Sequence, residues 1–127
     1  MVSSRKGNMI DFEISEGKDD TFVSLKACSM GDDIVVTIFN KNAHIGAVAL
    51  AEYAFHEGRT SVSVLTRLGH KDDAIAQKVA HNITKNIQKV SCVVVGIHLD
   101  QINESEIHQI ERNCEVLTAK SIELLRS

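Results

Sequence analysis

The sequence predicts an α+β domain in which a largely antiparallel sheet of about six strands packs against two helices. Up to residue 68, short runs of alternating apolar and polar residues are separated by turn residues, a pattern typical of half-buried strands. After residue 70 the apolar residues recur about every four positions, which indicates a helix. A nearly continuous apolar run over 90–99 separates this helix from a second one. The expected order of elements is therefore β-β-β-β-β-α-β-α.

Three strands are expected in the first third of the chain. The segment "MIDFEIS" over 9–15 alternates cleanly, with its isoleucines and its phenylalanine on one face. The segments "TFVSLKACSM" over 21–30 and "IVVTIFN" over 34–40 are rich in β-branched and other apolar residues. The polar stretches "EGKDD" and "GDD" between these runs are predicted to be turns. Residues 1–8 are expected to form a frayed N-terminus.

A hairpin is expected in the next part of the chain. The segment "IGAVALAEYAF" over 45–55 has small residues on both faces, which places this fourth strand inside the sheet. Gly58 in "HEGR" can adopt a positive φ in the hairpin turn. The segment "TSVSVLTRL" over 60–68 is the fifth strand. If the fifth strand and the strand over 90–99 share the sheet, the helix between them forms a right-handed crossover and the two strands run parallel.

Two helices are expected after residue 69. The apolar stripe of the first helix consists of Ile75, Val79, Ile83 and Ile87. Asn103 and Glu106 predict a capping box at the start of the second helix. Its core face is expected to consist of Ile107, Ile110, Cys114, Leu117, Leu124 and Leu125. The strand over 90–99, between the helices, is expected to be covered on both faces by helices or sheets.

The composition indicates a single domain of 127 residues in the cytoplasm. The net charge of -3 argues against a nucleic-acid binder that relies on bulk electrostatics. No apolar run is long enough to span a membrane, and "MVSSRKGNMIDFEIS" lacks the apolar core of a signal peptide. The cysteines Cys28, Cys92 and Cys114 form no CxxC pair, so they are interpreted as buried thiols rather than zinc ligands.

The expected topology brings polar residues from four segments to one edge of the sheet. The start of the fourth strand lies beside the end of the fifth, where the first helix begins, and a parallel sixth strand ends there too. The candidate ligand residues at this edge are His44, Gly46, Thr66, Gly69, His70, Lys71, His98 and Asp100. Carboxyl ends of parallel strands beside a helix N-terminus are common ligand sites.

The sequence "GHKDD" over 69–73 allows two interpretations. A helix N-terminus offers unpaired backbone amides and a partial positive charge, and the histidine and lysine here add cationic donors, together with Arg67. This arrangement suits a phosphate or a carboxylate. The two aspartates, in contrast, favour the same helix start without any ligand, and no complete phosphate-loop or dinucleotide motif is present.

Two catalytic alternatives use residues of the same edge. His44, His70 and His98 with Asp100 form a chemically possible metal site, although their spacing matches no short zinc motif. A hydrolase triad can be drawn from Ser63, His70 and Asp100, but no nucleophile motif supports it.

Three segments, "HIGAVALAE", "SVSVLTRLGHKDDAIAQKVAHNI" and "VVVGIHLDQINESEI", resemble the prenylated-flavin chaperone family, to which the small D subunit associated with gallate decarboxylase belongs. The resemblance covers roughly residues 20–125. It implies a fold like that of small proteasome-assembly chaperones and a homodimer. It also implies a non-enzymatic protein that carries prenylated FMN, or FMN, between the flavin prenyltransferase that makes it and a UbiD-type decarboxylase.

On this chain, the resemblance assigns cofactor binding to the eight candidate ligand residues. The helix start would take the flavin phosphate, and the small residues of the fourth strand would allow a flat ring to approach. With four phenylalanines, one tyrosine and no tryptophan, an aliphatic slot or a dimer partner has to shield that ring. Two other functions stay open: a protein-assembly chaperone or accessory subunit without a small ligand, and a small metal-dependent enzyme.

Overall fold

The structure of the chain is a computed structural model that describes residues 9–67, 72–98 and 101–126. Its elements are β1 (Asp11–Glu16), the 3-10 helix η1 (Asp19–Thr21), β2 (Val23–Met30), β3 (Asp33–Phe39), β4 (Ala47–Ala54), β5 (Arg59–Thr66), α1 (Asp73–Ile87), β6 (Ser91–Gly96) and α2 (Glu104–Arg126). This is the expected order, with the short η1 added between β1 and β2.

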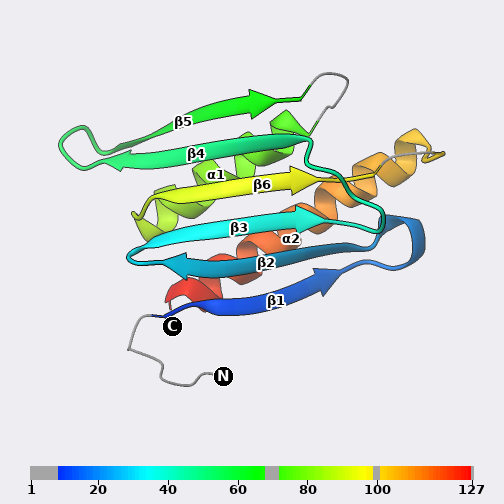
Figure 1. Ribbon diagram of the computed structural model, residues 1–127, viewed down its shortest axis with the longest axis horizontal. Helices are drawn as coiled ribbons and strands as arrows, with labels where there is room; N and C mark the ends of the chain where they lie inside the picture. Colours follow the sequence, from blue (N-terminus) through cyan, green and yellow to red (C-terminus); the bar gives the residue numbers. More distant parts are fainter. Residues whose placement is uncertain (1–8, 68–71, 99–100, 127) are drawn as a thin grey trace.

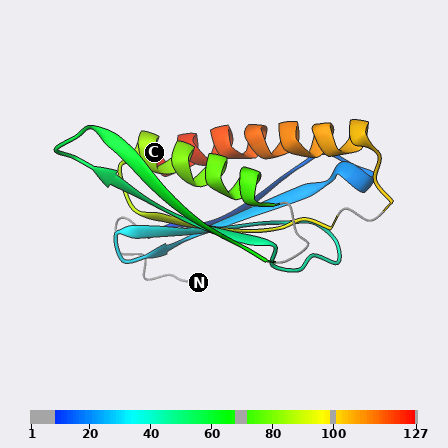
Figure 2. The same cartoon turned by 90° about the horizontal axis from the view of Figure 1, so that it is seen from above.

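The six strands of the described residues form one sheet in the order β1-β2-β3-β6-β4-β5. β3 and β6 run parallel, whereas the other neighbouring strands run antiparallel. Both helices lie on the same face of the sheet (Figures 1 and 2), with α1 on β4, β5 and β6 and α2 on β1 and β2. The predicted α+β fold is therefore confirmed. β5 and β6 run in the same direction, as expected, but β4 lies between them.

The two ends of the sheet carry different connections (Figure 1). We call the end where β1, β3, β5 and β6 finish the site end, and the opposite end the hairpin end. The connections at the site end are 17–22, 40–46, 67–72 and 97–103. The connections at the hairpin end are 31–32, 55–58 and 88–90. The hairpin end is thus built from the shorter links.

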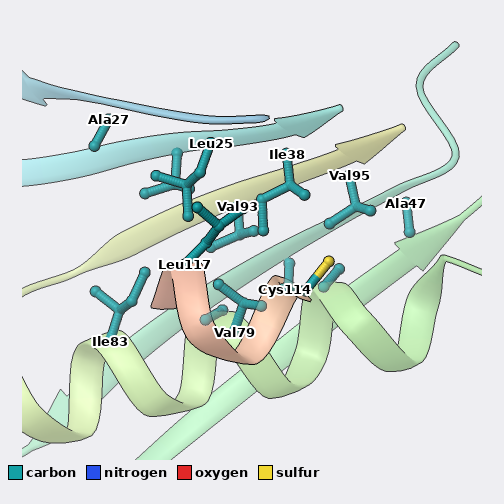
Figure 3. Packing of buried hydrophobic residues seen from close by; sticks show 14 of the residues in the cluster. Leu25, Ala27, Ile38, Ala47, Val79, Ile83, Val93, Val95, Cys114 and Leu117 are labelled. Atoms are coloured by element: carbon teal, nitrogen blue, oxygen red, sulfur yellow. The ribbon is translucent and has the colours of Figure 1, made fainter. Parts of the chain in front are cut away.

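The core lies between the sheet and the two helices (Figure 3). Leu25 and Ile38 of the sheet and Leu117 of α2 are fully buried, and burial of each such side chain contributes about 1.5–3 kcal/mol to stability. The face of β4 that α1 covers consists of the small residues Ala47, Ala49 and Ala51. Small residues let α1 approach β4 closely, which accounts for the alanine pattern of this interior strand.

The ends of the helices are fastened by hydrogen bonds. The predicted capping box is present, since the Glu106 amide donates to Asn103 Oδ1 (2.8 Å) and the Asn103 amide donates to Glu106 Oε1 (3.0 Å). Gln88 is the C-cap of α1, and its left-handed φ of 60° lets its amide donate to the carbonyl of Thr84. The hydroxyls of Thr84 and Ser91 share a buried hydrogen bond of 2.8 Å, which ties this helix end to β6.

Three expectations about burial are wrong. Leu124 is 42% exposed, because the buried stripe of α2 continues from Ser121 to Leu125 instead. Cys28 and Cys92 are only half-buried, because they lie on the sheet face that carries no helix. For the same reason the apolar run over 90–99, which forms β6, is covered on one face rather than on two within the described chain.

Candidate functional site

The strand register brings the ends of three strands together at the site end. Ala47, at the start of β4, pairs with Thr66 at the end of β5 and with Val95 near the end of β6. His44, Gly46, Thr66 and His98 therefore lie at the same end of the sheet. The other predicted site residues, Gly69, His70, Lys71 and Asp100, lie outside the described residues.

The packing at the site end explains why residue 46 is a glycine. A Cβ at Gly46 would collide with the carboxylate of Asp72, which is only 2% exposed. The Asp72 carboxylate accepts a hydrogen bond from the Ile97 amide (3.3 Å) and so joins the start of α1 to the end of β6. The next residue, Asp73, accepts from the Ala74 amide (2.9 Å). The start of α1 thus carries two carboxylates that suit its dipole, as the purely structural interpretation of "GHKDD" expects.

The alanines of β4 are not accessible to a flat ring. Ala47, Ala49 and Ala51 are at most 1% exposed, because α1 covers them. The expectation that these small residues let a flat ring approach β4 is therefore wrong.

Exposed polar side chains lie next to this buried junction. The Arg67 amide donates to the Gly46 carbonyl (2.9 Å), and its guanidinium Nη1 donates to the Ile45 carbonyl (2.9 Å). These two bonds hold Arg67 against the 40–46 connection. The side chains of His44 and Thr66 are exposed as well. The site end thus carries an exposed guanidinium, imidazole and hydroxyl, and a hydrogen bond holds the guanidinium in place.

The side chain of Asn40 forms hydrogen bonds with both backbone groups of His98. Asn40 Nδ2 donates to the His98 carbonyl (2.9 Å), and the His98 amide donates to Asn40 Oδ1 (2.6 Å). His98 borders a hollow of about 360 Å³, which we call the loop hollow. The residues that line the loop hollow are Asp19, Asp20, Phe22, Asn40, Lys41, Asn42, His98 and Ile102.

Sequence reasoning missed all of these residues except His98. They belong to connections, where no apolar period marks a residue as facing inward. A usable signal was the pair of asparagines in "NKN", directly after the third strand, because asparagine often bonds to backbone groups and tolerates left-handed φ.

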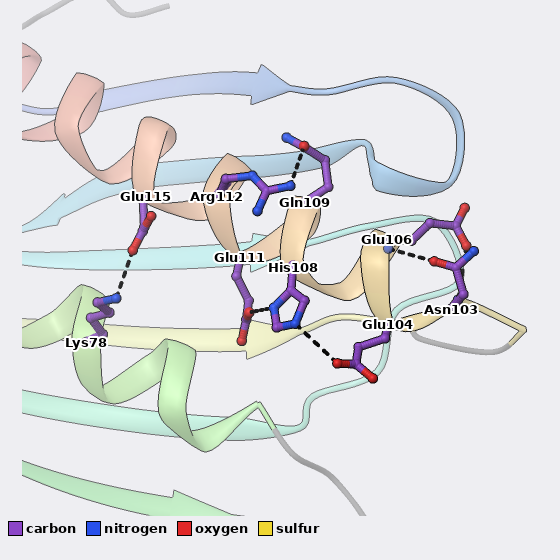
Figure 4. A network of polar contacts seen from close by, with 9 residues as sticks. All are labelled: Lys78, Asn103, Glu104, Glu106, His108, Gln109, Glu111, Arg112 and Glu115. Carbon is purple, nitrogen blue, oxygen red and sulfur yellow. Dashed lines mark hydrogen bonds and ion pairs between the residues drawn. The ribbon is translucent and has the colours of Figure 1, made fainter.

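A second hollow of about 550 Å³ is a groove between α1 and α2. Its rim carries a polar network (Figure 4), in which Lys78 Nζ donates to Glu115 Oε2 (2.8 Å). This bond and the charge of Glu115 raise the pKa of Lys78 above its ordinary value. His108 lies between Glu111 (3.1 Å) and Glu104 (3.7 Å). The side chains of His108, Glu111 and Glu104 are exposed.

Metal ligands and reactive thiols can be sought among the described residues. These residues contain no group of three or more histidine, cysteine or acidic side chains placed to hold a metal ion, although His70 and Asp100 of the predicted metal site fall outside them. Burial and the nearby carboxylate of Asp72 raise the pKa of Cys114 from 9.0 to about 12. The thiol of Cys114 therefore stays neutral near pH 7, unlike a catalytic thiolate.

A comparison with family models decides the relationship. The model of the prenylated flavin chaperone LpdD-like domain matches residues 17–126. The chain belongs to the prenylated flavin chaperone family. The matched stretch contains every predicted site residue and the whole loop hollow. A comparison with curated proteins found no match.

Among solved structures, the chain is similar to one titled "Crystal Structure of a Novel Chaperone Complex for Yeast 20S Proteasome Assembly". The TM-score is 0.61 at 15% sequence identity, and the match covers 94% of this chain and 96% of that chain. At this identity the likeness concerns the fold, and it confirms the expected similarity to proteasome-assembly chaperones. Within the described part of the chain, neither helix combines the length and the apolar character needed to cross a membrane.

Proposed function

We propose that this member of the prenylated flavin chaperone family is a non-enzymatic carrier of prenylated FMN or FMN. It receives the cofactor from the flavin prenyltransferase that makes it and delivers it to a UbiD-type decarboxylase. The observation that carries the proposal is the convergence at the site end. There His44, Thr66, Arg67 and His98 gather around the ends of three strands, beside a hollow and within the family's matched region.

In this proposal, cationic side chains rather than helix amides hold the phosphate. The buried carboxylate of Asp72 already lies at the start of α1, where its negative charge disfavours a second anion. His70 and Lys71 bind the phosphate together with the exposed Arg67 and His44. Charge-assisted hydrogen bonds of this kind are short and strong, yet they remain reversible when exposed, as a carrier requires.

The remaining predicted residues have secondary roles in the proposed flavin binding. Thr66, Gly69 and Asp100 complete the proposed set around the phosphate and the ribityl chain. Gly46 acts indirectly, because it leaves the space that the Asp72 carboxylate occupies.

The experiment is a titration of the purified protein with FMN and with anaerobically prepared prenylated FMN. A His70→Ala, Lys71→Ala double variant is expected to bind either flavin about tenfold to a hundredfold more weakly, because it loses charge-assisted bonds to the phosphate. A matched control is the His81→Ala, Lys85→Ala double variant, which removes the same residue types from the body of α1. Its affinity is expected to equal that of the parent.

If neither flavin binds the parent protein, the carrier function is wrong. The alternative, a protein-assembly chaperone or accessory subunit without a small ligand, would then be favoured, since the chain has the fold of the yeast assembly factor. If both double variants lose affinity equally, the phosphate is not held at the start of α1.

We also propose that the protein is a homodimer formed through the sheet face without helices. The centre of this face is apolar, with Val35, Cys92 and Leu50 in one row and Val94 and Val48 in the next. Leu50 and Leu65 are 52% and 76% exposed there. Charged side chains such as Lys26 and Glu52 lie toward the margins, which is the composition of an interface core with a polar rim.

The size of the face suits a second copy. Strands about 4.8 Å apart, with about 3.3 Å per residue, give the six strands of six to eight residues a face of roughly 700 Å². Two such faces bury roughly 1,400 Å², which lies within the range of stable interfaces, and two sheets pack well at about 10 Å.

A further inference from the structure

We propose that the loop hollow is the subsite for the isoalloxazine ring of the flavin, with Phe22 and Ile102 as its apolar wall. This inference rests on the proposed function, which leaves the position of the ring open. It assigns ligand contacts to the β1–β2 connection and to the 40–46 connection. Of the residues in these two connections, the predicted phosphate site includes only His44 and Gly46.

The topology makes the loop hollow a crevice. It lies at the carboxyl ends of β3 and β6, the one parallel pair of the described sheet. The chain leaves the two strands in opposite directions. The 40–46 connection crosses β6 on the side away from the helices, where the His44 carbonyl occupies the place of a Cβ at Gly96 (Figure 2). From β6 the chain continues to α2, on the helix side. Ligands commonly bind where the connections of adjacent parallel strands diverge in this way.

Several residues in the walls of the loop hollow have left-handed backbone conformations. Asp19, Asn42 and Gln101 have left-handed φ values of 53°, 61° and 57°. They lie in the three connections that surround the loop hollow, and Asp19 and Asn42 line it directly. A non-glycine residue in this region costs about 1–3 kcal/mol unless its surroundings compensate, and such residues cluster at ligand sites.

The chemistry of the loop hollow suits a neutral, planar ring. Phe22 is 44% exposed although it is large and aromatic, so it presents a ring face for stacking. The carboxylates of Asp19 and Asp20 can accept the N–H of the pyrimidine part of the flavin. The ammonium of Lys41 and the amide of Asn42 can donate to its carbonyl oxygens.

The charge of the loop hollow also orients the flavin. Asp19 and Asp20 disfavour a phosphate in the loop hollow, so the phosphate points away, across the end of β6. Ile97, directly after β6, connects the loop hollow with the start of α1, because its amide donates to the Asp72 carboxylate. In the sequence, Asp72 directly follows the proposed phosphate residues His70 and Lys71. A volume of about 360 Å³ is small among ligand sites, which suits the ring alone rather than the whole nucleotide.

The test measures the affinity of the full chain for FMN and for riboflavin, which lacks the phosphate. The Phe22→Ala variant is expected to bind both about fivefold to tenfold more weakly, because it loses ring contacts that both ligands make. The His70→Ala, Lys71→Ala double variant is expected to weaken FMN alone. Phe55→Ala, at the hairpin end and 68% exposed, is the matched control and is expected to change neither affinity.

A second variant keeps the fold intact while it removes a polar contact. Asn42→Gly retains the left-handed backbone, since glycine adopts φ of 61° readily, but it removes the amide. It is expected to weaken both ligands by about threefold to tenfold with an unchanged melting temperature.

The outcomes separate the two proposals. If FMN binds and the double variant weakens it, but Phe22→Ala and Asn42→Gly bind like the parent, the ring lies elsewhere and only the subsite is wrong. If neither flavin binds the parent, the carrier function fails and the subsite fails with it. Equal losses for FMN and riboflavin in both single variants support the subsite.

Discussion

The two ends of the sheet solve the same backbone problem with different residues. At the hairpin end, the β2–β3 and β4–β5 turns place glycine at the left-handed positions, with φ of 61° at Gly31 and 63° at Gly58. At the site end, Asp19, Asn42 and Gln101 take such φ values although they carry side chains. The difference teaches that turns which need only to reverse the chain use glycine, whereas the site end accepts strain and keeps polar groups around a hollow.

Among the described residues, each end has one exception with a local reason. Gln88 is left-handed at the hairpin end because it ends α1, where its amide bonds to the Thr84 carbonyl. Gly17 is a glycine at the site end because the Asn113 side chain and the Thr21 carbonyl fill the place of its Cβ. Neither exception changes the comparison.

The largest expected effect contrasts a glycine at each end. Gly46→Ala should lower the free energy of unfolding by about 3 kcal/mol, because the new Cβ collides with the buried Asp72 carboxylate. Gly31→Ala should cost only about 1 kcal/mol, since no atom lies near its Cβ and only the positive φ opposes it. Urea unfolding of both variants measures the difference. Equal costs would mean that Gly46 is not confined by Asp72.

The next effect concerns the side chain that holds His98. Asn40→Ala should cost about 2 kcal/mol, because the amide and carbonyl of His98 lose their partner in a half-buried place. Asn86→Ala is the control, since the bonds of Asn86 to the Asn82 carbonyl and to Arg126 lie on the exposed surface, and their loss should cost about 0.5 kcal/mol or less. Chemical denaturation distinguishes them, and a cost at Asn40 no larger than at Asn86 would contradict the account.

The stability of the protein at alkaline pH tests the environment of the buried Cys114 thiol. The pKa of Cys114 is raised from 9.0 to about 12 in the folded state, so the fold favours the neutral thiol. The stability from this group is complete below pH 9 and is lost as pH rises toward 12. At about pH 10.5 the loss should reach about 2 kcal/mol.

Cys114→Ala removes this part of the pH dependence, apart from a constant cost for the smaller side chain. The difference between parent and variant, followed by urea unfolding from pH 8 to 11, should therefore shrink as pH rises. A difference that stays constant over this range would show that the thiol does not titrate abnormally.

The smallest expected effect lies on the sheet face between the two ends. Leu50→Glu places a charge in the apolar centre of the proposed dimer interface and should weaken dimerisation at least about tenfold. Leu124→Glu, at a 42% exposed position on α2, should leave it unchanged. Sedimentation velocity over a range of protein concentrations measures both. A parent that stays monomeric throughout would contradict the homodimer.

The element order and strand alternation were predictable because they depend on local periodicity. Ile34, Val36 and Ile38 alternate inward as "IVVTIF" requires, and Asn103 caps α2 as its type suggests. The position of β4 between β5 and β6 was only partly predictable, since strand pairing depends on contacts distant in the sequence.

The candidate site was predictable to a smaller degree. His98 and Thr66 could be placed at one end of the sheet because the strand ends that carry them follow from topology. Phe22, Asn40 and Asn42 could not, because residues in connections follow no period and their positions depend on tertiary contacts. The sequence also contained no sign that the buried carboxylate of Asp72 fills the place of a side chain at Gly46.

The most direct test of the central claim, that the site end binds the flavin, is a backbone amide NMR titration of the full chain with anaerobically prepared prenylated FMN. The account predicts shifts that concentrate at Phe22, Asn42 and His98, with Gly31 and Gly58 at the hairpin end unchanged. Shifts confined to the groove between α1 and α2, or to the hairpin end, would contradict it, as would a spectrum that does not change.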